Sequence, residues 1–249
     1  MKNLFISIIL FVLAGWVHAE ELQICIDPYP PFKIVDSSGT VSGGIDIELT
    51  NALLDAMEVK AKYTVYPWAR CLNSLKHGTC DFVSGITKNT EREKYLSYIE
   101  PPYKTNSVKV FYVNKGDETK FKTYNDIQNS TVGILRKAKY FDKFDNDTDI
   151  EKQEVSNELS GFNMLKLKRI DTFITTEEVG DYYIETHGYS NTFGKAEYKY
   201  NQKIAVYFAL SKKSKFAGRL PEFVKIVKEL KEQGVFDEEM DNYLKFKNK

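Results

Sequence analysis

The segment from Gly78 to Tyr103 constrains the fold of this chain most. Its apolar run Asp81–Val83 predicts the end of a β-strand, and the hydroxyl-rich residues Ser84–Thr87 predict a turn. Thr90 then predicts the N-cap of a helix. A strand that stops in such a turn leaves backbone N–H groups free at its tip, where they can bind an anion.

Arg92 lies in the first turn of this predicted helix. A cation there is unfavourable beside the positive end of the helix dipole, which suggests an anionic partner. The planar guanidinium suits a carboxylate, because it can donate two parallel hydrogen bonds to it. The alternative is an exposed ion pair with Glu91 or Glu93.

Length and charge exclude several classes of protein. The 249 residues suffice for one large domain or two small ones, each with its own core. The 35 basic and 35 acidic residues balance, so nothing indicates a nucleic-acid partner. The His and Cys spacings do not suggest a zinc site, and we expect neither a metal nor a cofactor.

The N-terminus has the pattern of a secretory signal peptide over residues 1–19. Lys2 supplies the positive charge, and Leu4–Val17 forms an apolar stretch too short to span a bilayer comfortably. Val17–Ala19 ends in a small residue, which predicts cleavage before Glu20; the alternative is an uncleaved anchor. The pattern predicts a soluble protein exported to the periplasm.

Export would permit disulfide bonds among the three cysteines. We predict a Cys71–Cys80 bridge, because a helix over Trp68–Lys76 that turns back at Gly78 could bring both residues to one face of the core. Cys25 would then be a buried small hydrophobic residue. The residues before it lack the small side chain of a lipid-attachment site, so we expect no lipid anchor.

Three motifs carry a family resemblance: Asp81–Thr87, Thr90-Glu91-Arg92 and Tyr98–Tyr103. Together they resemble the core signature of the family 3 extracellular solute-binding proteins, the amino-acid-binding components of bacterial ABC importers. The resemblance extends, more thinly, over the whole chain after the leader.

Alternating strands and helices predict an α/β protein. The resemblance implies a two-lobe periplasmic-binding-protein fold of type II, with the lobes joined by two hinge crossovers. The first lobe would comprise residues 20–103 and 207–249, and the second residues 104–206. The cleft between the lobes would hold the ligand.

The resemblance places several ligand contacts in the first lobe. Arg92 would clamp a carboxylate together with the tip of the preceding strand, formed by Ser84, Gly85 and Thr87. Tyr29, in a proline-rich loop, and Trp68 would cover the two sides of the ligand, unless they only pack against the core. Arg70 is a second candidate anion ligand, with a solvated helix face as the alternative.

The predicted second-lobe contacts depart from the family pattern. The loop after the strand Thr131–Leu135 is usually Gly-Ser-Thr in amino-acid binders, but here it is basic and includes Arg136 and Lys139. It could hold a more acidic ligand. An acidic residue at the end of the strand Ile170–Ile174 would pair with the ligand ammonium, and this position corresponds to Glu177 or Thr176. The alternative for Glu177 is a charge at a helix start.

These patterns predict a periplasmic solute-binding protein, not an enzyme. It would capture a polar amino acid or a related small carboxylate and act as a monomer with an inner-membrane ABC permease. One alternative is a dehydratase-like enzyme, for which Glu48, Glu177 and His187 are loose candidates without a recognisable acid–base pair. Another is the ligand-sensing partner of a membrane receptor.

Overall fold

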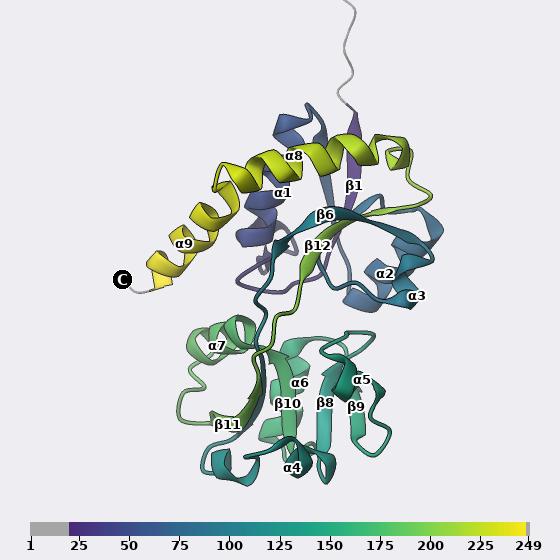
Figure 1. The fold of residues 1–249 in the computed structure, drawn as a ribbon. Helices are drawn as coiled ribbons and strands as arrows, with labels where there is room; N and C mark the ends of the chain where they lie inside the picture. The colour runs from purple at the N-terminus through teal and green to yellow at the C-terminus, as the bar shows by residue number, and fades with distance from the viewer. Residues whose placement is uncertain (1–19, 248–249) are drawn as a thin grey trace, which may run out of the picture.

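The computed structural model describes residues 20–247, so the predicted signal peptide over residues 1–19 lies outside the described residues. Two five-stranded sheets form the centres of two lobes, which lie one above the other in Figure 1. Within residues 20–247, no helix is long and apolar enough to cross a membrane.

The sheet of the first lobe has the strand order β4-β1-β5-β12-β6. Strand β1 pairs in parallel with β4 and β5, and β12 pairs antiparallel with β5 and β6. The carboxyl ends of the parallel strands thus meet at one edge, where open α/β sheets place ligands. The bounds are β1 Glu21–Ile26, β4 Lys60–Val65, β5 Phe82–Ile86, β6 Leu96–Lys104 and β12 Val206–Ser211.

Helices cover both faces of this sheet; α8 lies across the top of the molecule in Figure 1, and α9 descends from it at the left. Their apolar faces pack on the strands, with Leu53 of α1 and Phe223 of α8 fully buried. The helices are α1 Ile45–Ala56, α2 Trp68–His77, α3 Thr90–Glu93, η2 Ala217–Arg219, α8 Leu220–Glu232 and α9 Val235–Lys247; a hairpin joins β2 Ile34–Val35 to β3 Val41–Gly43.

The sheet of the second lobe has the order β11-β7-β10-β8-β9. Strands β8, β9 and β10 are mutually parallel, whereas β7 runs antiparallel to β10 and β11. Its elements are β7 Lys109–Asn114, η1 Glu118–Lys120, α4 Tyr124–Gln128, β8 Thr131–Leu135, α5 Asp142–Asn146, β9 Glu151–Val155, α6 Glu158–Lys166, β10 Thr172–Thr176, α7 Glu177–Thr186 and β11 Phe193–Tyr200.

The chain passes between the lobes twice, from β6 to β7 and from β11 back to β12. Figure 1 shows both connections side by side. This arrangement confirms the predicted α/β fold of two lobes with two crossovers. The short connections 105–108 and 201–205 are the segments in which a relative rotation of the lobes would be absorbed.

The predicted Cys71–Cys80 disulfide is wrong, because Cys80 bonds to Cys25 across a Cα–Cα distance of 6.0 Å. The parallel pairing of β1 with β5 sets Ile24 opposite Phe82, and this pairing brings the two cysteines together. Cys71 on α2 is buried with a free thiol, 3.8 Å from the carbonyl oxygen of Tyr66. The helix-turn geometry considered for Cys71 was local, whereas strand pairing decides the bridge.

The predicted start of the helix that carries Arg92 is displaced by one residue. Asn89, not Thr90, caps α3, and its side-chain oxygen accepts the backbone N–H of Arg92 at 2.9 Å. Gly44 is the N-cap residue of α1. A Cβ at Gly44 would lie 2.4 Å from the Phe32 carbonyl oxygen, so the close approach of that loop requires glycine.

Candidate functional site

A cavity of about 90 Å³ lies between the two lobes. Its walls come from the loop after β1, α1, α2, β5 and α3 on one side, and from β7, the loop after β8, α6 and β10 on the other. Since a single water needs about 10–15 Å³, this cavity has room for a solute of a few non-hydrogen atoms. A cavity bounded by both lobes can hold a ligand that bridges them.

Among the described residues 20–247, Arg92 of α3 is the only arginine that lines this cavity, and it is 4% exposed. Its Nη1 donates to both the carbonyl and the hydroxyl oxygen of Thr87, each at 3.0 Å. Its Nη2 donates to the Lys137 carbonyl of the second lobe at 3.2 Å. No carboxylate of residues 20–247 forms an ion pair with it, and burial lowers its pKa. The guanidinium can therefore take an anion without breaking an existing salt bridge.

Two aromatic side chains of the first lobe close over the cavity and contact the second lobe. The Tyr29 hydroxyl donates to Thr176 Oγ1 at 2.6 Å, and Trp68 Nε1 donates to the Lys137 carbonyl at 3.3 Å. The guanidinium carbon of Arg92 lies 5.4 Å from the Trp68 ring centre. Both rings can therefore shield a bound solute from water.

A buried charge cluster lies at the first-lobe wall. Lys33 forms an ion pair with Asp27, and Asp46 accepts the Tyr103 hydroxyl at 2.9 Å. Burial opposes the charge on Lys33, but Asp27 and Asp46 together raise its pKa. A Cβ on Gly85 would lie 2.8 Å from Asp46 Oδ2, so glycine is needed for the strand to pass this cluster.

Lys109 of β7 supplies a buried cation from the second lobe and is 5% exposed. Its Nζ donates to Ser107 Oγ at 2.8 Å and to Thr176 Oγ1 at 2.7 Å. Burial and the neighbouring charge of Lys104 lower the pKa of Lys109 to about 7. Within residues 20–247, the Lys109 side chain forms hydrogen bonds with these two hydroxyl groups alone.

Glu158 lines the cavity at the first turn of α6 and is 2% exposed. Asn157 caps this helix by accepting the Ser160 backbone N–H at 2.8 Å. Burial, followed by the charge of Asp27, raises the pKa of Glu158 to about 8. Its carboxyl group is therefore mostly protonated at neutral pH.

Seven of the residues predicted for the site line this cavity: Tyr29, Trp68, Gly85, Thr87, Arg92, Lys139 and Thr176. They come from both lobes, from segments far apart in the sequence. Among residues 20–247, no group of three or more His, Cys, Asp or Glu side chains suits a metal ion.

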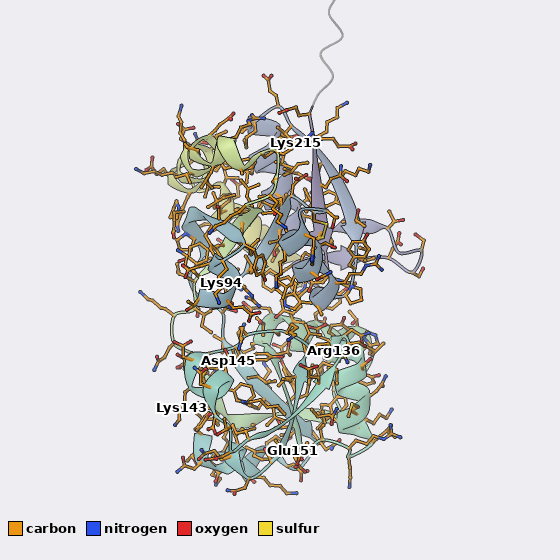
Figure 2. The ribbon with its side chains drawn as sticks, turned by 90° about the vertical axis from the view of Figure 1, so that its right-hand side faces the viewer. Lys94, Arg136, Lys143, Asp145, Glu151 and Lys215 are labelled. Atoms are coloured by element: carbon orange, nitrogen blue, oxygen red, sulfur yellow. A yellow bond between two sulfur atoms is a disulfide. The ribbon has the colours of Figure 1, made fainter. Side chains whose placement is uncertain are left out.

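The structure places Arg136 and Arg70 away from the cavity. Both are exposed: Arg136 pairs with Glu154 at 3.1 Å, and the Arg70 guanidinium stacks 4.0 Å from the Tyr66 ring centre. Figure 2 shows Arg136 at the end of the second lobe nearer the first, whereas Glu151 lies toward the far end. Arg136 thus lies at the end of its sheet that is nearer the first lobe, but its side chain turns to β9 and solvent and does not line the cavity.

Glu177 and Ser84 also leave the candidate site. Glu177 forms an ion pair with Lys195 at 2.8 Å and lines a separate, wider groove beside α7 and α9. Ser84 is fully buried beneath the strand tip, and its hydroxyl has no hydrogen-bond partner in the described chain. Thr176 thus occupies the strand end, and Glu177 begins the following helix.

Sequence reasoning missed six charged residues of the cavity wall: Asp27, Lys33, Asp46, Lys104, Lys109 and Glu158. Lys109 had a detectable signal, because a lysine within the apolar run Val108–Val113 has to be buried with the strand. Asp46 and Glu158 resemble ordinary acidic residues at helix starts. Their burial depends on packing that the sequence does not display.

Comparison with known proteins shows which family the chain belongs to. Residues 22–246 match the model of the bacterial extracellular solute-binding proteins, family 3. The ABC transporter arginine-binding protein 1 of Escherichia coli (strain K12) is 28% identical over 137 residues, which are 54% of each chain. The chain spans about half the length, or less, of the curated relatives it matches.

Solved structures extend the likeness of the fold over nearly the whole chain. An ancestral arginine-binding protein bound to arginine has a TM-score of 0.76 and 22% identity over 90% of this chain and 97% of its own. A histidine kinase sensor domain with similarity to periplasmic binding proteins has a TM-score of 0.77 and 17% identity over 91% and 96%. The fold is the type II periplasmic-binding-protein fold, and the chain belongs to the bacterial extracellular solute-binding proteins, family 3.

Proposed function

We propose that this protein captures a small carboxylate-bearing solute between its lobes, in the periplasm, and delivers it to an ABC permease of the inner membrane. The observation that carries the proposal is Arg92, a buried guanidinium at a cavity between two lobes whose acceptors are all neutral oxygens. A carboxylate is the partner that such a fork binds best.

The ligand would bind mainly through first-lobe residues. Its carboxylate accepts from Arg92, and the Thr87 hydroxyl and the backbone at Gly85 supply further polar contacts. Tyr29 and Trp68 cover its apolar part. Lys139 and Thr176 contribute from the second lobe, so a polar amino acid or a related compound would touch both halves.

Capture would occur by closure of the hinge. The lobes, with proposed bounds 20–103 plus 207–249 and 104–206, would rotate about the connections 105–108 and 201–205. A solute that contacts both lobes binds the closed form more tightly than the open form and so shifts the population toward closure. We expect a monomer to suffice, because one chain supplies both walls of the cavity.

The importer role rests on the family and on a relative whose name assigns it to an ABC transporter. The likeness to a histidine kinase sensor domain supports an alternative, in which the closed form docks on a membrane receptor. Measuring uptake of the solute by cells that lack this protein separates the two roles. Uptake should be lost if the protein is an importer component and should persist if it is a sensor.

Calorimetry on Arg92 variants tests the binding site. Replacing Arg92 with alanine should weaken binding of a carboxylate ligand by at least about 3 kcal/mol, since the carboxylate would be buried without its cation. Arg92→Lys should retain part of the affinity, because it keeps the charge but loses the fork.

The matched control is Arg70→Ala, which removes an exposed arginine from the same lobe and should leave the affinity unchanged. Unaltered affinity in Arg92→Ala would remove Arg92 from the site and overturn the proposal.

One observation favours a second candidate, a dehydratase-like enzyme. Glu158 is a cavity carboxyl group whose pKa is raised to about 8, and a protonated carboxyl can serve as a general acid. A bound ligand that is released chemically unchanged after prolonged incubation, as followed by NMR, would exclude this candidate.

A further inference from the structure

Three lysines of the cavity wall are not exposed: Lys33, Lys104 and Lys109. Of these, Lys109 alone has no acidic partner within residues 20–247. Lys33 pairs with Asp27, and Lys104 pairs with Glu178 at 2.8 Å. For Lys109, the described chain offers only the hydroxyl oxygens of Ser107 and Thr176. An ammonium has three donors, so one remains for a further acceptor.

Thr176 strengthens the preference for an anion at this point. Its Oγ1 accepts from Lys109 at 2.7 Å and from the Tyr29 hydroxyl at 2.6 Å. A hydroxyl oxygen has two acceptor positions, and both are used. Thr176 can therefore only donate its own hydrogen to a ligand, which suits an oxyanion and not an ammonium group.

The remaining charges of the cavity do not neutralise Lys109. Asp27 is engaged by Lys33, and Asp46 accepts from Tyr103. Glu158 is mostly protonated at neutral pH. Arg92 and Lys109, one from each lobe, are thus the two buried cations at this cavity without a carboxylate partner in residues 20–247.

We propose that the ligand carries two acidic groups, one bound by Arg92 of the first lobe and the other by Lys109 and Thr176 of the second. This inference rests on the proposed solute-binding function and narrows its ligand to a small dicarboxylate-type anion. The cavity of about 90 Å³ favours a short carbon chain between the two groups. A ligand of this kind joins the lobes by a charge at each end, so both ends stabilise closure.

Isothermal titration calorimetry at pH 6.5 on the mature protein tests the inference with succinate, glutarate, butyrate and L-arginine. The better diacid should bind about 30-fold or more tightly than butyrate, which keeps one carboxylate and replaces the other with an apolar end. L-Arginine should give no binding heat, because its cationic end would meet Lys109.

The Lys109→Met variant keeps the length and the apolar stem of the side chain. It should reduce the preference for the diacid over butyrate to about threefold or less while butyrate affinity persists. Lys109→Arg should retain the preference, since it keeps the charge. The matched control, Lys199→Met on the neighbouring strand β11, alters an exposed lysine and should bind like the unmodified protein.

The outcomes separate this inference from the proposed function. An unchanged preference in Lys109→Met, or tighter binding of L-arginine than of either diacid, overturns the inference and leaves a solute-binding protein that depends on Arg92. Binding of no carboxylate at all overturns both. Should Lys109→Met fail to fold, Lys109→Gln, which removes the charge but keeps a donor for Ser107 and Thr176, gives the decision by the same loss of the diacid preference.

Discussion

Glu158 and Lys109 are buried titratable side chains whose pKa values are shifted toward neutral pH. Burial raises the pKa of Glu158 to about 8 and lowers that of Lys109 to about 7. In both cases the low-polarity surroundings disfavour the charged form. Each displacement makes the stability of the folded protein depend on pH, with opposite sign.

The Glu158→Gln variant isolates the first of these effects. Between the ordinary value of 4.5 and about 8, the folded protein holds a proton on Glu158 that the unfolded chain releases. The unfolding free energy should therefore fall as pH rises through this window, by at most about 1.4 kcal/mol per pH unit. Glutamine is neutral at every pH and should lack this fall.

Urea unfolding of both proteins at pH 5, 6, 7 and 8 measures the difference. The pKa of Lys109 is lowered from 10.5 to about 7, so its contribution to the unfolding free energy is lost as pH falls from 10.5 to about 7. This contribution is the same in both proteins and cancels in the comparison. Parallel pH profiles for Glu158→Gln and the unmodified protein would show that Glu158 is ionised in the folded state.

At the scale of elements, the disulfide ties β1 to the start of β5. It closes a loop with a sequence separation of 55 residues that contains α1, β4 and α2. The elements that carry Asp46 and Trp68 are therefore held inside a covalent ring. Their placement at the cavity depends on this ring as well as on packing.

Replacing Cys80 with alanine should lower the unfolding free energy by about 4 kcal/mol, because an open loop of this length gains conformational entropy when unfolded. Cys71→Ala should retain the bridge and lose only the packing of one thiol. Thermal unfolding with and without reductant checks the result. A larger loss, or loss of reductant sensitivity, in Cys71→Ala would point to Cys71 as a bridge partner.

The elements were predictable where their signals are local. The turn after Val83, the short helix that carries Arg92 and the second-lobe strand Thr131–Leu135 all follow from residues within a few positions of one another. The partner of Cys80 was not predictable in this way, because it is set by which strands become neighbours. The same holds for Lys33, whose burial depends on its pairing with Asp27 and on the fold of the proline-rich loop.

At the scale of the whole molecule, hydrogen bonds from three predicted site residues of the first lobe bridge the lobes across the cavity. They join Tyr29 to Thr176, and Trp68 and Arg92 to the carbonyl of Lys137. The motifs of the first lobe predicted their donors. Of the acceptors, Thr176 was also a predicted site residue, but the Lys137 carbonyl was not predicted, since a backbone carbonyl leaves no signal in the sequence.

Tyr29→Phe removes one of these bridges without removing the ring. It should reduce ligand affinity about fivefold, which corresponds to the roughly 1 kcal/mol of one hydrogen bond that exists only in the closed form. Small-angle scattering should show a larger radius of gyration for the ligand-free variant than for the ligand-free unmodified protein. Tyr66→Phe, whose hydroxyl forms no hydrogen bond within residues 20–247, is the control. Equal affinities for the two variants would mean that this bridge does not stabilise closure.

The Lys137 carbonyl has a consequence for selectivity. It accepts from both Arg92 and Trp68, and Lys137 adopts the left-handed backbone conformation, with a φ of 63°. A ligand that binds Arg92 as proposed would compete with this main-chain oxygen for the guanidinium. A weak hydrogen-bond acceptor would not displace the carbonyl, so the backbone at Lys137 would set the minimum acceptor strength that a ligand needs for binding.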